Sequence, residues 1–153
     1  MPNWCVGELK TRGTKENIIK FILEGLQPVD GLGRYRDKLS LITEEGYKYI
    51  YSKGKCWIKG TRRGFIEGID FSFENEEDGV LVKTFDSKFA WEIDAKQLLH
   101  VCKEYDIDMK IHGFERGMEF NQIIEIIDGK IIKDKKLHFE DYDWNCINSK
   151  LGG

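Results

Sequence analysis

Two amphipathic helical patterns interrupt a series of strand-like segments, and this order limits the folds open to the chain. Apolar residues from Ile18 to Leu26 recur at helical spacing after Thr14, whose hydroxyl can cap the first turn, so a helix is predicted over residues 15–26. Asp94 can cap a second helix that ends near residue 105. Period-two alternation predicts strands over residues 3–12, 47–51, 56–59, 65–73, 80–85, 107–114, 118–127 and 130–133.

The order strand, helix, strands, helix, strands favours an α+β fold, in which both helices cover one face of an antiparallel sheet. It corresponds to the ferredoxin-like βαββαβ arrangement, elaborated here with extra hairpins. A length of 153 residues suits a single domain. Residues 29–46 carry breaking glycines and few apolar side chains, so an inserted loop region is predicted around residues 29–55. The last few residues are expected to be frayed.

The composition is that of a folded protein, with 41% hydrophobic and 33% charged residues. No apolar run approaches the roughly 20 residues that span a bilayer, and the first ten residues lack an apolar signal-peptide core. A cytoplasmic location without membrane association is therefore predicted. The four cysteines form no Cys-x-x-Cys pair, which favours reduced thiols over a zinc or redox centre. Two disulfides would require a secreted protein. No cofactor is expected.

Charge is distributed unevenly along the chain. Residues 1–63 hold 13 Lys/Arg against 7 Asp/Glu, whereas residues 64–153 hold 11 against 20. Such asymmetry bears on partners and on association rather than on the fold. This bipolar charge is one ground for expecting a binding protein.

The basic half contains a segment, residues 47–63, in which aromatic and cationic side chains interleave. Nucleobases can stack on exposed aromatic rings while Lys and Arg neutralise phosphates. Strand alternation alone would produce the same pattern, with the rings in the core and the charges at the rim. The candidate binding residues are Tyr47, Tyr49, Tyr51, Lys53, Lys55, Trp57, Arg62 and Arg63.

Two further segments are candidate binding surfaces. The loop 31–34 contains Gly31, Gly33 and Arg34, with Arg36 close by, and could hold a phosphate with backbone N–H groups. Without a preceding strand and a following helix, an ordinary surface loop explains it equally. An acidic run could mimic a nucleic-acid backbone and occupy a basic groove on a partner, or form a solvated hairpin tip. Its residues are Glu74, Glu76, Glu77 and Asp78.

Several stretches together resemble the YubB-type ferredoxin-like family. They are the opening Met1-Pro2-Asn3-Trp4-Cys5, then Phe89-Ala90-Trp91, Phe114-Glu115-Arg116-Gly117-Met118-Glu119-Phe120 and Asp128-Gly129. The chain departs from the family at residues 29–55, which look inserted. It also departs in the middle strands, where Lys59-Gly60-Thr61-Arg62 replaces a tryptophan-glycine-threonine-lysine stretch. The resemblance implies a ferredoxin-like fold and an origin in a phage, plasmid or other mobile element. It implies no catalytic residues.

No residue pattern specifies a catalytic centre. His100 and Cys102 lie two residues apart on the second predicted helix and point to different faces, a poor geometry for joint metal binding. A Cys–His nucleophilic pair would have to assemble through the tertiary fold. Glu115 and Glu119 flank a turn and could act as acid and base, although an exposed hairpin explains them as well.

Three functional hypotheses follow. The leading one is a non-enzymatic binding protein of a phage or mobile element that occupies a host macromolecule, either a protein or a ribonucleoprotein complex. An anti-defence inhibitor, such as one of the anti-CRISPR type, is one form of it. The first alternative is a single-stranded nucleic-acid or nucleotide-binding module that uses residues 47–63. The second is a small enzyme without a recognised motif.

Overall fold

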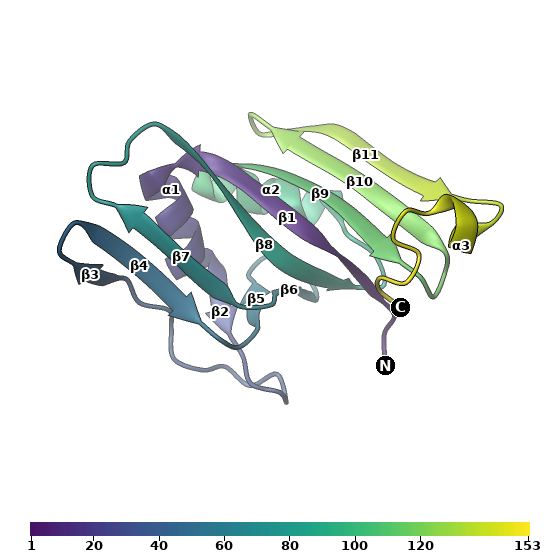
Figure 1. Ribbon diagram of the computed structural model, residues 1–153, viewed down its shortest axis with the longest axis horizontal. Helices are drawn as coiled ribbons and strands as arrows, with labels where there is room; N and C mark the ends of the chain where they lie inside the picture. Colours follow the sequence, from purple (N-terminus) through teal and green to yellow (C-terminus); the bar gives the residue numbers. More distant parts are fainter.

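A computed structural model describes residues 1–153 and contains two antiparallel sheets with few helices, an α+β structure (Figure 1). The larger sheet has eight strands in the order β11-β10-β9-β1-β8-β6-β5-β2. These strands are β1 (Trp4–Thr14), β2 (Leu26–Pro28), β5 (Cys56–Ile58), β6 (Gly64–Ile66), β8 (Val80–Ala90), β9 (Asp108–Glu115), β10 (Phe120–Ile127) and β11 (Lys130–His138). The smaller sheet has the order β3-β4-β7, formed by β3 (Ile42–Glu44), β4 (Tyr47–Ser52) and β7 (Ile69–Glu74).

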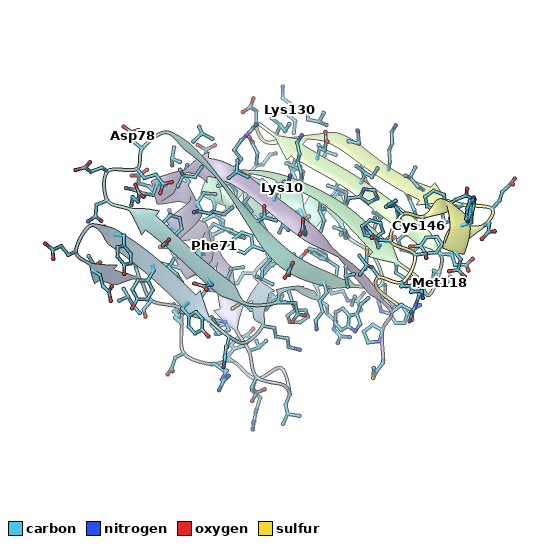
Figure 2. The ribbon with its side chains drawn as sticks, in the orientation of Figure 1. Lys10, Phe71, Asp78, Met118, Lys130 and Cys146 are labelled. Carbon is cyan, nitrogen blue, oxygen red and sulfur yellow. The ribbon has the colours of Figure 1, made fainter.

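Strand β1 lies at the centre of the larger sheet and determines which side chains face each way. It pairs with β8 along its whole length, from Trp4 opposite Ala90 to Thr14 opposite Val80. Successive residues of a strand point to opposite faces. Odd-numbered residues of β1, such as Cys5 and Leu9, are completely buried in the core. Even-numbered residues therefore lie on the other face, here called the open face, where Figure 2 labels Lys10.

The helices cover the opposite face of the larger sheet and lie behind it in Figure 1. Helix α1 (Lys15–Lys20) begins where predicted, and the hydroxyl of Thr14 accepts the N–H of Asn17 at 3.2 Å. It continues as a π-helical turn, η1 (Phe21–Gly25), which leads directly into β2. Helix α2 (Ala95–Tyr105) begins at Asp94, which caps it as predicted. No helix of the chain combines the length and the apolar character needed to cross a membrane.

A cluster of 27 buried residues forms the core, to which the helices, the larger sheet and the smaller sheet all contribute. Phe21 packs edge-on against Phe85 of β8 and Tyr105 of α2, with ring centroids 6.1 and 5.7 Å apart. The side chain of Gln122 is buried and makes two hydrogen bonds to the backbone of Ile93. Its amide oxygen accepts from N–H at 2.7 Å and its amide nitrogen donates to C=O at 3.1 Å. These bonds connect β10 to the segment that precedes α2.

The smaller sheet confirms the predicted strand over residues 47–51 and shows a further strand at the end of the segment 29–46, which was predicted as loop. Residues 42–44 and 47–52 are strands β3 and β4, while residues 30–41 form the loop. Strands β4-β5 and β6-β7 form one long hairpin that contributes to both sheets. The register shifts by one residue between Ser52 opposite Ile69 and Cys56 opposite Ile66. This extra residue bends the hairpin, and Gly68 takes φ +111° there.

The C-terminal segment is more ordered than the sequence predicts. Strand β11 extends to His138, and a short helix α3 (Tyr142–Asn145) follows (Figure 1). The predicted fraying of the last residues is wrong, because Gly153 donates its N–H to the carbonyl of Trp4 at 2.9 Å. Gly152 lies between β1 and β9 with φ +78°, where a Cβ would be 2.2 Å from the carbonyl oxygen of Phe114. The segment therefore joins the ends of these two strands.

Candidate nucleic-acid interface

A row of aromatic side chains crosses the open face near the start of β1. The register places Trp57 of β5 opposite Phe65 of β6, and Phe65 opposite Lys88 of β8. Trp4 of β1 meets the ring of Phe65 edge-on, with centroids 6.1 Å apart. At the other end, Tyr35 from the 30–41 loop stacks on Trp57 at 6.2 Å and an angle of 12°.

Three cationic side chains lie over these rings. The ammonium of Lys55 is 4.8 Å from the ring centre of Phe65. The guanidinium of Arg63 and the ammonium of Lys88 are 5.6 and 5.1 Å from the ring centre of Trp4. Cation–π attraction holds each charge beside an aromatic surface. We call this set the cationic aromatic strip; its members are Trp4, Tyr35, Lys55, Trp57, Arg63, Phe65 and Lys88.

Local backbone contacts fix the orientation of Trp57 and the shape of the turn that carries Arg63. Residues 58–64 form a tight turn around Thr61, whose hydroxyl donates to the carbonyl of Ile58 at 2.6 Å and accepts the N–H of Gly64 at 3.0 Å. The indole N–H of Trp57 donates to the carbonyl of Thr61 at 3.0 Å. These bonds fix the orientation of the Trp57 ring, and Arg63 is exposed in the same turn.

Carboxylates border the strip on one side. Glu67 pairs with Lys88 at 2.5 Å, and the next row across the sheet contains Asp86 opposite Glu8. Like charges placed directly opposite on paired strands repel each other. Lys55 and Arg63 form no salt bridge. An anionic ligand would therefore be attracted along the strip and repelled from the row beside it.

A groove of about 810 Å³ on the open face begins at Lys88 and this acidic row and extends to β9 and β10. His112 stacks on Phe114 with ring centroids 4.6 Å apart and nearly parallel planes. Partial burial lowers the pKa of His112 below its ordinary value. Lys110 and Glu125 face each other across β9 and β10 at 3.6 Å. The groove therefore mixes both charges, whereas the strip is cationic.

The predicted segment 47–63 is divided between the two sheets. Its tyrosines lie on the outer face of the smaller sheet, where Tyr47 is opposite Glu74 and Tyr51 is opposite Asp70. The hydroxyl of Tyr47 donates to Glu44 at 2.6 Å, and this bond raises the pKa of Tyr47. We call this surface the acidic tyrosine face; it consists of Glu44, Tyr47, Tyr49, Tyr51, Asp70 and Glu74. Carboxylates surround these rings, so the surface repels phosphate.

The predicted glycine loop binds its own aspartate. Asp30 accepts the N–H groups of Leu32 and Arg34 at 2.8 and 2.9 Å, and its carboxylate pairs with the Arg34 guanidinium at 2.7 Å. These contacts lower the pKa of Asp30. The N–H groups that could have held a phosphate are thus occupied by a carboxylate. Arg36 is exposed two residues further on and donates its backbone N–H to the carbonyl of Pro28.

The remaining charged candidates lie apart from the strip. Lys53 is exposed at the bend of the long hairpin. The acidic run Glu74, Glu76, Glu77 and Asp78 occupies the turn between β7 and β8, where Figure 2 labels Asp78. Lys15 of α1 donates to the carbonyls of Glu74 and Asn75 at this turn. The acidic run is continuous with the acidic tyrosine face through Glu74.

Thiols and histidines do not form a nucleophilic pair. All four cysteines are free and buried, and burial raises the pKa values of Cys5 and Cys102 to about 12. Cys146, labelled in Figure 2, donates to the amide oxygen of Asn121 at 3.4 Å, and the amide nitrogen of Asn121 lies 3.2 Å from His112. Asn121 thus lies between the thiol and the imidazole.

Metal-ligating groups and the predicted acid–base pair give no catalytic geometry. No group of three or more His, Cys, Asp or Glu residues is arranged to hold a metal ion. Glu115 is completely buried, and its carboxylate accepts the N–H groups of Gly117 and Met118 at 2.6 and 2.7 Å. Glu119 is exposed with φ +57° in the same turn. Glu115 therefore stabilises the turn between β9 and β10.

Four members of the strip were not predicted from the sequence. Trp4 and Tyr35 lie outside the segment 47–63, and Phe65 and Lys88 follow it. The pairing of β5, β6, β8 and β1 brings Trp4, Phe65 and Lys88 together, and the 30–41 loop adds Tyr35. The alternation of Phe65 with buried Ile66 and of Lys88 with buried Phe89 was a usable signal for their common face.

Comparisons with protein-family models, with curated proteins and with solved structures found no match to this chain. The YubB-type resemblance and the mobile-element origin that it implies therefore stay predictions.

Proposed function

We propose that the chain binds single-stranded nucleic acid along the cationic aromatic strip. The observation that supports this most is the convergence of four aromatic rings and three cations on one stretch of the open face. Bases stack on aromatic rings without sequence preference, and cations beside the rings neutralise the phosphates. Lys55 and Arg63 form no salt bridge with a carboxylate. A phosphate backbone could therefore bind them without breaking an existing ion pair.

The surrounding fold supports the same proposal. The larger sheet contains the strand order β9-β1-β8-β6, with one helix after β1 and another after β8. We propose that this part of the chain is an elaborated ferredoxin-like sheet. RNA-recognition modules built on such sheets stack bases on open-face aromatic residues. In this chain the acidic row at Glu8 and Asp86 would confine the strand to the strip and keep it off the centre of the sheet.

Fluorescence anisotropy with labelled strands of about 12 nucleotides tests the proposal, because sites of this kind span roughly 4–16 nucleotides. At about 50 mM salt we expect binding to single-stranded DNA or RNA, with log K falling linearly as log salt rises, by about 0.7 per neutralised phosphate. Duplex of the same length should bind more weakly, because its bases are not free to stack. Equal affinity for duplex, or no binding of single strands at low salt, would overturn the proposal.

A second candidate function is occupation of a host protein with a basic surface, as expected for a phage or mobile-element inhibitor. The acidic tyrosine face favours it, since exposed tyrosines and carboxylates suit a cationic partner. A pull-down from host lysate discriminates between the candidates. It compares the proteins that the unchanged chain and two variants recover in stoichiometric amounts. Charge reversal at Glu44, Asp70 and Glu74 should abolish recovery, whereas Lys55→Ala with Arg63→Ala should leave it intact. Recovery that survives the reversal would remove this candidate.

A further inference from the structure

A pocket lies beside the cationic aromatic strip, between the turn after β5 and the start of α2. Its volume is about 290 Å³, and the residues that matter to its chemistry are Arg62, Arg63, Trp91, Glu92, Asp94 and Gln97. Arg63 belongs both to this pocket and to the strip, where its guanidinium lies over Trp4. The pocket therefore adjoins the cationic aromatic strip. The proposed function gives the pocket itself no role.

The backbone at Trp91 is strained. Trp91 has φ +70°, a conformation that bulky side chains rarely adopt and that glycine adopts freely. Its N–H donates to the carbonyl of Asn3 at 2.8 Å, and this bond holds the segment against the start of β1. The indole is 57% exposed, so burial in the core does not explain why a tryptophan occupies this position. Strained residues of this kind concentrate at ligand-binding sites.

The charges around Trp91 favour an anionic ligand. Neither Arg62 nor Arg63 forms a salt bridge, and both are exposed. The two carboxylates at the pocket already have partners. Glu92 pairs with Lys136 at 2.5 Å, and Asp94 accepts the N–H groups of Lys96 and Gln97 at 2.9 and 3.3 Å. Arg62 and Arg63 are thus the cationic residues without a salt-bridge partner in the pocket that Trp91 also lines.

We propose that Trp91, Arg62 and Arg63 form a nucleotide subsite, in which one base stacks on the indole and its phosphate binds the two guanidinium groups. The proposal rests on the proposed single-strand binding and adds a terminal position to it. A volume of about 290 Å³ is near the lower limit of small-ligand pockets, roughly 300 Å³, and suits one nucleotide unit. Arg63 would hold the phosphate that joins this unit to the strand stacked on the strip.

Trp91→Gly tests the subsite, because it removes the ring and also relieves the strained backbone. We expect single-strand affinity to fall by roughly tenfold, the effect of losing one base–aromatic stack. The melting temperature should stay the same or rise, since glycine suits φ +70°. Trp144→Ala is the matched control, because Trp144 is 84% exposed in α3 and should not affect binding. Trp91→Phe, which keeps a ring, should retain affinity within about twofold.

The outcomes separate this inference from the proposed function. If the unchanged chain binds no single strand, both fail. If it binds and Trp91→Gly binds equally well, the subsite is wrong while the strip stands. A loss of affinity that Trp91→Phe does not restore, or one accompanied by a matching fall in melting temperature, would assign Trp91 a structural role and overturn the subsite.

Discussion

The two aromatic surfaces of this molecule come largely from one hairpin and have opposite charge. The β5–β6 half supplies Trp57 and Phe65 to the cationic aromatic strip, while the β4–β7 half supplies the tyrosines of the acidic tyrosine face. The bend between them, at residues 53–55 and Gly68, sends each half to a different sheet. Aromatic rings alone therefore do not indicate the kind of partner. The charges on the neighbouring strands indicate it, and these charges have opposite signs in the two halves of the hairpin.

Charge reversal on the strip should produce the largest effect. In the double variant Lys55→Glu, Arg63→Glu, repulsion between carboxylates and phosphates should weaken single-strand binding by roughly a hundredfold or more. The matched control replaces Glu44 and Asp70 with Lys on the acidic tyrosine face. Anisotropy titrations measure both variants. A gain of affinity in the control as large as the loss in the strip variant would show that net charge, and not the strip, determines affinity.

The bend that separates the two surfaces depends on Gly68. Its φ of +111° is unfavourable for any residue with a Cβ, so Gly68→Ala should lower the free energy of unfolding by about 1–3 kcal/mol. Gly31→Ala is the control, because its Cβ would meet no atom within 4 Å and its φ is not positive. Urea denaturation measures both. A neutral Gly68→Ala would mean that the bend forms without glycine.

Each of the two surfaces carries an exposed tyrosine, and the two can be compared directly. Tyr35 is 69% exposed on the strip and Tyr51 is 54% exposed on the acidic tyrosine face. Removal of one stacking ring costs about 1–3 kcal/mol of binding free energy, so Tyr35→Ala should reduce single-strand affinity by roughly tenfold. Tyr51→Ala should leave it unchanged. Equal losses of affinity in anisotropy titrations would show that both surfaces contact the strand, which contradicts the distinction between them.

The smallest expected effect is on the pH dependence of stability and concerns His112, which lines the groove on the open face. The pKa of His112 is lowered in the folded chain, because burial disfavours the imidazolium. Above the unfolded-state pKa of about 6.5 the ring is neutral in both states. As pH falls toward the folded-state pKa, the unfolded chain takes up a proton first, so stability declines. His112→Gln should reduce this decline between pH 7 and pH 5.5 in urea denaturation. An unchanged pH profile would contradict the assignment.

Local residue patterns predicted most of β1, β9 and β10 and both helix starts, whereas β8 and β11 extend beyond the predicted ends at residues 85 and 133. The alternation in β1 and β9 and the caps Thr14 and Asp94 act over a few residues and need no tertiary context. The π-helical end of α1 and the ordered C-terminal segment were not predicted. Both depend on distant contacts, such as Gly25 against Tyr105 and Gly153 against Trp4.

The candidate site was predicted only in part. Lys55, Trp57 and Arg63 were found because they lie in one segment of the sequence. Their separation from Tyr47 and Tyr51 was missed, because it depends on a one-residue shift of register in the hairpin. A single extra residue in one strand is not visible as a change in alternation when turn residues surround it.

Photo-crosslinking of a thiouridine-substituted single strand, with the modified peptides identified by mass spectrometry, tests the central claim most directly. We predict crosslinks in the peptides that contain Trp4 and residues 55–65, and none in residues 42–51 or 69–78. Crosslinks concentrated on the acidic tyrosine face, or absent from residues 55–65 under conditions where the strand is bound, would contradict the assignment of the cationic aromatic strip.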